Sequence, residues 1–315
     1  TMNAVSFRWY GVYRILTLEQ VQELSPALRF YTSQQLSEQP ELIAQMHILY
    51  GRMPVAWWVL AKQLLWIQTS YAGVEGLLTP EGIAHPALLT NARIHGETIS
   101  EHLFGMLLSL FRQLTCAYRQ QLEQRWSRIG GIDILAGKTL GIVGTGAIGR
   151  RAAEIGKAFA MRVLGLRVHD LPLAPFDAIY TTERLHEFLP QCDVVMLTLP
   201  LTARTRRIIG AAELAVMKPG AVLLNIGRGQ LIDTDTLVDA LAAGRLGGAA
   251  LDVTNPEPLP AEHPLWTLPN VLITPHIAGS YPGYDIDAAE LFLANLRRFL
   301  AGEELMNLVD KVAGY

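Results

Sequence analysis

The stretch TLGIVGTGAIGRR, residues 139–151, decides the fold of this chain. A short apolar run leads into Gly144, Gly146 and Gly149, which have the spacing G-x-G-x-x-G, and helix-compatible residues follow them. A strand, a glycine turn and a helix in this order are typical of a dinucleotide-binding unit. Gly144 would permit the tight turn, Gly146 would let the backbone approach a pyrophosphate, and Gly149 would let the helix pack closely on the strand.

The helix that follows the turn is predicted to begin near Ala147 and Ile148, whose amide N–H groups would bind the phosphates. A glycine-rich turn that binds nothing is the alternative interpretation, and the strand and helix on either side argue against it. Six apolar runs recur between residues 138 and 276: TLGIVG, RVLGLR, DVVMLTLP, AVLLNIG, GAALDV and NVLITP. Runs that are apolar on consecutive residues are typical of strands covered on both faces. The sequence therefore predicts a doubly wound parallel sheet, the Rossmann arrangement.

The length of 315 residues is typical of about two domains. The first hundred residues alternate short apolar runs (YRIL, ALRFY, QMHILY, LLWIQT) with polar, helix-compatible stretches, which indicates a smaller α/β domain. The amphipathic segment FLANLRRFLAGEELMN near the C-terminus could pack back on that domain. We therefore expect a discontinuous substrate-binding domain, residues 1–97 and 282–315, and a dinucleotide-binding domain, residues 98–281.

A long helical pattern begins at Glu97 and runs through ETISEHLFGMLLSLFRQLTCAYRQQLEQRW. Its centre, from His102 to Phe111, is apolar nearly all round, so that part should be buried on most sides. A seam between domains or an interface between subunits would bury it.

The composition excludes several classes of protein. Half of the residues are apolar and 17% are charged, which is typical of a folded globular chain. The net charge is −3 and basic runs are absent, so neither nucleic acid nor a membrane is an expected partner. Cys116 and Cys192 are too few for a disulfide framework and suit a reducing compartment. Without a membrane-length apolar run or a signal-peptide pattern, a cytoplasmic location is expected, and no metal site is predicted.

The end of the second predicted strand, RVLGLR, bears on the choice of dinucleotide. An acidic residue there would accept hydrogen bonds from the ribose hydroxyls of NAD, but the residue is Arg167. An arginine would pair with the 2′-phosphate of NADP, and His169 could assist. NADP(H) is therefore expected in preference to NAD(H). In the alternative, Arg167 points to solvent and Asp170 serves the ribose.

Polar residues follow three successive predicted strands. Arg228 lies beyond AVLLNIG, Asp252 ends the next strand with Glu257 in the Pro-rich loop beyond it, and His276 follows NVLITP. Because the carboxyl ends of parallel strands lie at one edge of the sheet, these side chains should converge there.

The convergent residues suit hydride transfer to a carbonyl group. His276 could deliver a proton to the carbonyl oxygen, Glu257 could stabilise its imidazolium form, and Arg228 could bind a carboxylate and polarise the carbonyl. Taken singly, each residue has a plainer interpretation as a structural or solvated side chain. Together they predict a redox site for a 2-keto acid, with a nicotinamide cofactor supplying the redox chemistry.

Several long motifs, GIVGTGAIGR, LLNIGRGQLIDTDTLVDAL, GGAALDVTNPEPLPAEHPLW and VLITPHIAG, occur in the order found in the D-isomer-specific 2-hydroxyacid dehydrogenases, and the chain resembles that family. LLWIQTSYAGVEGLL and NARIHGETISEHLFGMLL also resemble it. The resemblance implies two Rossmann-like or flavodoxin-like domains with the site in the cleft between them. It also implies a homodimer formed through the long helix, and a small 2-keto or 2-hydroxy acid as substrate.

The resemblance assigns further roles. Arg228, Glu257 and His276 match the catalytic positions of the family. Backbone groups of Ala72, Gly73 and Val74 would hold the substrate carboxylate, and Asp252 with the Ile226 carbonyl would engage the nicotinamide carboxamide. The remaining expected cofactor contacts are Pro200, Thr205, Gly227 and Gly279.

Two departures from the family pattern affect the expected substrate and cofactor. Tyr71 stands where small residues are frequent, and Arg167 makes the chain similar to the NADPH-preferring glyoxylate/hydroxypyruvate reductase branch. Arg52 could reach a substrate carboxylate, although a surface role explains it as well. The alternatives are an NAD-preferring dehydrogenase and a dinucleotide-sensing corepressor. Formate-type members carry glutamine in place of Glu257, and phosphoglycerate dehydrogenases often add a regulatory extension.

Overall fold

The computed structural model describes residues 5–7, 18–26 and 28–315 and divides the chain into two compact units. One unit comprises residues 1–94 and 281–315, and the other comprises residues 95–280. The sequence placed these boundaries after residues 97 and 281. The helix α4, Gly96–Phe111, lies wholly within the second unit. The boundary between the units therefore precedes the first turn of this helix.

The first unit contains a parallel five-stranded sheet with the order β2-β1-β3-β4-β5. Its strands are β1 (Val5–Phe7), β2 (Phe30–Thr32), β3 (Ile48–Tyr50), β4 (Trp66–Gln68) and β5 (Leu88–Thr90). The order 2-1-3-4-5 is that of flavodoxin-like folds. The expected runs ALRFY, QMHILY and LLWIQT overlap β2, β3 and β4, whereas YRIL lies outside the described residues.

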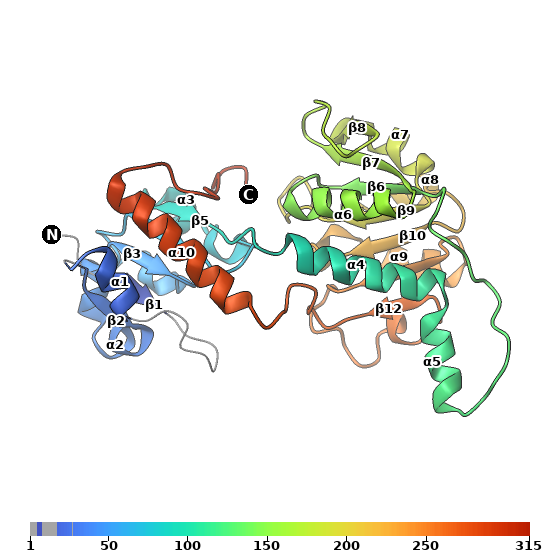
Figure 1. Cartoon of the computed structure of the whole chain (residues 1–315), viewed down its shortest axis with the longest axis horizontal. Coiled ribbons are helices and arrows are strands. Elements are labelled where there is room, and N and C mark those ends of the chain that lie inside the picture. Colours follow the sequence, from blue (N-terminus) through green and yellow to red (C-terminus); the bar gives the residue numbers. More distant parts are fainter. Residues whose placement is uncertain (1–4, 8–17, 27) are drawn as a thin grey trace. The chain divides into compact units, whose positions relative to one another are not determined.

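Among the described residues, four α-helices accompany this sheet: α1 (Leu18–Leu24), α2 (Ser33–Glu38), α3 (Pro80–Ala84) and α10 (Tyr284–Ala301). The C-terminal helix α10 lies along this sheet (Figure 1). It supplies Phe292 and Leu296 to a core with Ile48 and Trp66 of the central strands. Its apolar stripe therefore returns the C-terminal segment to the first unit, as its amphipathic sequence predicts.

The second unit contains a parallel seven-stranded sheet with the order β12-β11-β10-β9-β6-β7-β8. The six predicted runs form β6 (Thr139–Val143), β7 (Arg162–Arg167), β9 (Val194–Leu197), β10 (Val222–Asn225), β11 (Gly248–Leu251) and β12 (Val271–Ile273). The prediction of six strands was one too few, because β8 (Ala178–Thr181) adds a seventh at the edge. Its residues are only half-buried, so this strand lacks the continuous apolar run of its neighbours.

Helices cover both faces of this sheet, as a doubly wound domain requires (Figure 1). Val194 and Met196 of β9 pack on the side of α4 and α6 (Ala147–Ala158). Val195 and Leu197 of the same strand pack on the opposite side, with α7 (Leu185–Phe188), α8 (Ala211–Val216) and α9 (Thr234–Ala242). Alternate residues of one strand thus enter two separate cores, which explains why the run is apolar on consecutive residues.

The long helical pattern after Glu97 forms two helices, so the expectation of one continuous helix is wrong. Helix α4 ends at Phe111, and α5 (Leu114–Leu122) begins after Gln113, whose φ is +53°. A residue in the left-handed region interrupts the helical path. Leu103 and Leu107 of α4 are fully buried in the core that α4 shares with α6, so the cofactor domain itself buries much of the apolar centre of the pattern.

Candidate active site

The glycine turn joins β6 to α6 with the geometry its sequence predicts. Gly144 has φ +107°, a conformation that L side chains rarely adopt. A Cβ on Gly149 would lie 2.0 Å from the Gly144 carbonyl oxygen, so only glycine permits this approach of helix and strand. Gly146 caps α6, and a Cβ there would meet nothing within 4 Å. The amide groups of Ala147 and Ile148 lie in the first turn of the helix, and no side chain of Gly146 covers them. This arrangement suits the binding of a pyrophosphate.

Arg167 ends β7 directly beside this turn, because the Gly144 amide donates to the carbonyl of the preceding residue, Leu166, at 2.9 Å. Its side chain is half-buried and makes neither an ion pair nor a hydrogen bond within the described ranges. His169 and Asp170 are exposed, and Asp170 interacts electrostatically with Arg184. A cationic side chain without a partner thus borders the turn.

The three strands β10, β11 and β12 are neighbours, and their register fixes where the polar residues emerge. Asn225 pairs with Leu251, and Leu251 pairs with Ile273. Arg228 and His276 each follow three residues after these strand ends, and Asp252 follows directly. All three therefore leave the sheet at its carboxyl edge, the edge that carries the glycine turn after β6.

His276 and Glu257 form a close polar pair at this edge. Nδ1 of His276 lies 2.6 Å from Oε1 of Glu257, and the side chains remain 49% and 42% exposed. Because a carboxylate accepts hydrogen bonds, Nδ1 carries the proton. No hydrogen bond within the described part of the chain engages Nε2, so this nitrogen is available to a ligand. His276 has φ +55°, an uncommon conformation for a residue with a side chain.

The loop that carries Arg228 is held by Asn225, whose side chain is fully buried. Asn225 Nδ2 donates to the Arg228 carbonyl at 2.9 Å, and Asn225 Oδ1 accepts from the Gly227 amide at 3.0 Å. The Arg228 guanidinium is half-buried, and its Nη1 donates to the Gly227 carbonyl at 2.6 Å. The arginine therefore sits on a turn that a buried amide fixes from within the sheet.

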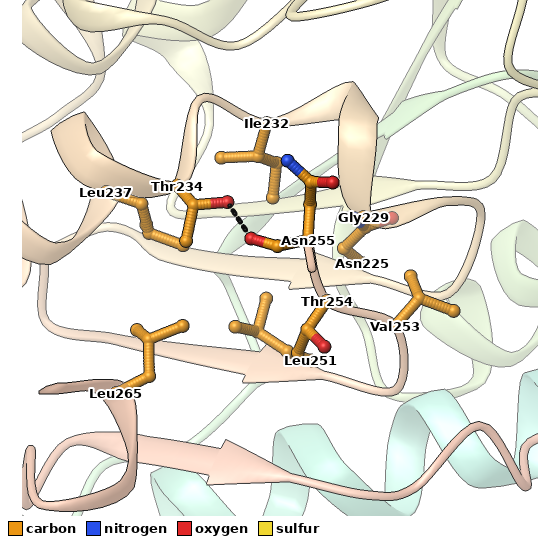
Figure 2. Close-up of a pocket in the computed structure, with 10 residues that line it drawn as sticks. All are labelled: Asn225, Gly229, Ile232, Thr234, Leu237, Leu251, Val253, Thr254, Asn255 and Leu265. Atoms are coloured by element: carbon orange, nitrogen blue, oxygen red, sulfur yellow. Dashed lines mark hydrogen bonds between the residues drawn. The ribbon is translucent and has the colours of Figure 1, made fainter. Parts of the chain in front are cut away.

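The Arg228 and Glu257 loops touch through their backbones. A Cβ on Gly229 would lie 1.9 Å from the Thr254 carbonyl oxygen, so glycine is required for this contact. Figure 2 shows a small pocket behind it, where Thr234 Oγ1 donates to the Asn255 carbonyl at 2.9 Å. Thr254 Oγ1 donates to the Pro256 carbonyl at 2.8 Å. These bonds anchor the segment that leads to Glu257.

Asp252 is buried, and groups of its own domain occupy its carboxylate. Oδ1 accepts from the Thr274 hydroxyl at 2.7 Å and from the Ile277 amide at 2.9 Å, and Oδ2 accepts from the Ala278 amide at 3.0 Å. Asp252 therefore holds the segment on both sides of His276. Its predicted contact with a nicotinamide carboxamide stays a prediction.

The other expected cofactor residues lie in loops at the same edge. Thr205 Oγ1 donates to the Pro200 carbonyl at 2.7 Å, which closes the loop after β9. Ile226 and Gly227 follow β10, and a Cβ on Gly227 would lie 2.7 Å from the Leu199 carbonyl oxygen. Gly279 packs against the His95 ring, where a Cβ would lie 3.1 Å from Cδ2.

In the first unit, the expected carboxylate loop is anchored to the end of β5. The Ala72 carbonyl accepts from Asn91 Nδ2 at 2.7 Å, and the Val74 side chain is buried. The backbone amides of Ala72, Gly73 and Val74 donate no hydrogen bond to any described residue. Consecutive amides of this kind can bind an anion. Beside them, the Arg52 guanidinium stacks 4.9 Å over the Tyr71 ring.

The sequence matches a family model described as D-isomer specific 2-hydroxyacid dehydrogenase, NAD binding domain, over residues 104–278. The chain belongs to the D-isomer specific 2-hydroxyacid dehydrogenase family. It is therefore an NAD(P)-dependent oxidoreductase, and residues 104–278 cover most of its seven-stranded unit.

Relatives of the dehydrogenase include proteins named as glyoxylate reductases. A glyoxylate reductase of Aeropyrum pernix is 42% identical over 227 residues, which cover 68% of this chain and 67% of that protein. A crystal structure of a family member from Aeromonas salmonicida is 37% identical, with a TM-score of 0.83 over 98% of this chain and 99% of that one. An NADPH-dependent glyoxylate/hydroxypyruvate reductase of Sinorhizobium meliloti, solved with NADP and sulfate, is 26% identical, with a TM-score of 0.85 and full coverage of both chains.

Sequence reasoning missed the residues that support the site. Asn225 bonds to the Arg228 carbonyl, and Gly229 permits the contact with the Thr254 carbonyl. Thr274 donates to Asp252, and His102 of α4 contacts Thr274. Asn225 and Gly229 lie on either side of Arg228 in the motif LLNIGRG. The polar Asn225 inside an apolar run is the sequence feature that could have indicated its supporting role. His102 was counted within the apolar centre of a helix.

The described ranges bear on three other possibilities, a metal site, a membrane span and a reactive cysteine. They contain no cluster of three or more residues suited to a metal ion, and none of their helices is long and apolar enough to cross a membrane. Cys116 and Cys192 are free thiols. Burial raises the pKa of the Cys192 thiol to about 12, so it is protonated at neutral pH and is a poor nucleophile.

Proposed function

We propose that this dehydrogenase reduces small 2-keto acids with NADPH, glyoxylate to the achiral glycolate and hydroxypyruvate or related acids to D-2-hydroxy acids. The observation that carries the proposal is the 2.6 Å contact between His276 and Glu257 at the carboxyl edge of the dinucleotide-binding sheet. A histidine paired in this way on Nδ1 can transfer a proton through Nε2. The relatives named as glyoxylate and glyoxylate/hydroxypyruvate reductases support this substrate class.

Each side chain of the site has a separate task in this reduction. When bound, NADPH supplies a hydride to the carbonyl carbon of the 2-keto acid, which breaks the C=O π bond and leaves the electron pair on oxygen. His276 gives its Nε2 proton to that oxygen, and the imidazole takes a proton back from solvent. Glu257 stabilises the imidazolium before transfer. Arg228 pairs with the substrate carboxylate and polarises the carbonyl.

The carboxylate loop of the first unit is the proposed second anchor of the substrate. Three consecutive amides, those of Ala72, Gly73 and Val74, lack acceptors within the described part of the chain. A substrate carboxylate would accept hydrogen bonds from these amides, as anions do from consecutive backbone N–H groups. Tyr71 and Arg52 border the loop and would limit the length of the substrate side chain.

The preference for NADPH rests on Arg167. Its guanidinium has no anionic partner among the described residues and borders the glycine turn, so it is available for a 2′-phosphate. Two similar structures, the one from Sinorhizobium meliloti and one from Xanthobacter autotrophicus, contain NADP or NADPH. Both support NADP(H) as the cofactor of this chain.

We also infer a homodimer in the cytoplasm. Leu114, Tyr118 and Leu122 recur every four residues on α5, and each is more than half exposed. An apolar stripe of this kind suits an interface between two copies. A sedimentation mass equal to one chain would contradict the dimer. The free cysteines are in keeping with a reducing compartment.

A panel of 2-keto acids, assayed with NADPH and with NADH, tests the proposed function. Saturable oxidation of NADPH by glyoxylate, hydroxypyruvate or a related short acid is the expected result, with glycolate as the product from glyoxylate and a D-2-hydroxy acid as the product from the longer acids. Tight dinucleotide binding without turnover on any acid would instead favour a dinucleotide-sensing binding protein.

A further inference from the structure

Helix α4 packs on the segment that carries the predicted catalytic histidine, and its polar contact there is made by His102, beside the Met106 sulfur, which lies 3.8 Å from Thr274 Oγ1. Nε2 of His102 lies 2.9 Å from Oγ1 of Thr274 and 3.6 Å from Oδ1 of Asp252. Thr274 Oγ1 in turn donates to Asp252 Oδ1 at 2.7 Å. These three side chains come from α4, from the end of β12 and from the end of β11, and all belong to the cofactor domain.

The direction of these hydrogen bonds follows from the number of protons available. The Thr274 hydroxyl has one proton, and it is donated to Asp252. The contact between His102 and Thr274 therefore requires a proton on Nε2 of the imidazole. The result is a directed series in which His102 donates to Thr274 and Thr274 donates to Asp252.

The far end of this series holds the backbone around His276. The Asp252 carboxylate accepts from the Ile277 amide at 2.9 Å and from the Ala278 amide at 3.0 Å, and the Asp252 carbonyl accepts from the His276 amide at 2.9 Å. His276 itself has φ +55°. A non-glycine residue in this region costs free energy, so surrounding contacts must hold it there.

We propose that His102 and Thr274 are positioning residues for proton transfer, because they fix the Asp252 carboxylate that holds His276 in its left-handed conformation. The inference rests on the proposed function only in its catalytic consequence. The 2% exposure of Asp252 makes the bond from Thr274 important, since a buried carboxylate that loses a donor has no water to replace it. Neither positioning residue needs to touch the substrate.

Plain helix packing would give a different response to substitution. Thr274→Val keeps the volume and branching of the side chain and removes only the hydroxyl. If the contact were packing alone, this variant would behave like the wild-type protein. If the hydroxyl positions Asp252, the Ile277 and Ala278 amides lose a well-placed acceptor, and His276 samples other conformations.

The experiment combines amide hydrogen exchange with steady-state kinetics on the full-length enzyme. In Thr274→Val we expect the Ile277 and Ala278 amides to exchange at least about tenfold faster, with kcat for 2-keto acid reduction lowered about ten- to a hundredfold. The KM for the keto acid should change little, because Arg228 and the carboxylate loop are intact. Thr274→Ser should restore both quantities, and His102→Phe should resemble Thr274→Val.

The matched control is Glu101→Gln, an exposed neighbour of His102 on α4, which should leave exchange and kcat unchanged. Exchange of the two amides at the wild-type rate in Thr274→Val would overturn the inference. Faster exchange with unchanged kcat would overturn its catalytic part. If the wild-type protein reduced none of the acids tested, the proposed function would fail, and the exchange rates would still decide whether Thr274 holds the turn.

Discussion

Nδ1 of His276 lies 2.6 Å from Oε1 of Glu257, although the two residues follow different strands and both side chains remain close to half exposed. This distance is typical of a charge-assisted hydrogen bond. It fixes the orientation of the imidazole ring and leaves Nε2 directed away from the carboxylate. The contact with Glu257 therefore holds the imidazole ring in one orientation while Nε2 stays accessible to a substrate.

Replacement of Glu257 by glutamine should preserve the shape of the side chain and remove its charge. We expect kcat for keto acid reduction to fall about ten- to a hundredfold, because the imidazolium loses a charged partner. Steady-state kinetics with NADPH measure the change. Glu262→Gln, an exposed residue of the same loop, is the control. An equal decrease of kcat in both variants would contradict a specific role of Glu257 in catalysis.

Gly229→Ala tests the backbone contact between the Arg228 and Glu257 loops. The new Cβ would lie 1.9 Å from the Thr254 carbonyl oxygen, so one loop must move. We expect a loss of about 1–3 kcal/mol in the free energy of unfolding, together with a lower kcat/KM. Chemical denaturation and kinetics check both. Gly105→Ala, where a Cβ would meet nothing within 4 Å, should cause neither loss.

Arg167→Ala tests the cofactor choice. We expect kcat/KM for NADPH to fall about ten- to a hundredfold while that for NADH changes little, because only NADPH carries the 2′-phosphate. Arg162→Ala removes an exposed arginine from the opposite end of β7 and should affect neither cofactor. An equal decrease with both cofactors in Arg167→Ala would contradict phosphate recognition.

Replacement of Asp193 by asparagine should make the free energy of unfolding less sensitive to acidic pH. Burial raises the pKa of the Asp193 carboxyl, but hydrogen bonds from the Lys218 ammonium and the Thr139 amide outweigh burial and hold the pKa below its ordinary value. A lowered folded-state pKa adds stability that is present above the ordinary pKa and is lost as the pH falls through the lowered one.

We therefore expect Asp193→Asn to lower the free energy of unfolding by about 1–2 kcal/mol at neutral pH, with a smaller difference below about pH 4. Urea unfolding across this pH range measures it. Asp239→Asn, an exposed residue on α9, should cause little change at any pH. A difference that is constant from neutral to acid pH would show that the charge of Asp193 is not its source.

Much of the cofactor domain is predictable from sequence because its strands are buried on both faces. β9 and β10 are fully buried over four residues each, and such runs are visible without any tertiary information. β8 was missed because its half-buried sequence, AIYT, lacks the run of large aliphatic residues that β12, at the other edge, retains. The break at Gln113 was also missed, since glutamine carries no local signal for a positive φ.

The sequence predicted the edge of the sheet at which the proposed site residues lie, but it did not predict the residues that contact them. Arg228, Asp252 and His276 follow recognisable strands, and parallel topology brings them to one edge. The contact of His102 with Thr274 joins residues 172 positions apart and depends on how α4 packs on the sheet. Hydrophobic periodicity describes which face of a helix is buried, but it does not identify the polar partner that a single histidine meets there.

The His276→Asn variant tests the central claim, that this dehydrogenase reduces 2-keto acids by proton transfer from His276. We predict that kcat/KM for the preferred keto acid falls about 10²–10⁴-fold while the protein remains folded and binds NADPH with wild-type affinity. His186→Asn, which alters a histidine paired with Glu213, should retain full activity. Turnover of His276→Asn near the wild-type rate would contradict the account.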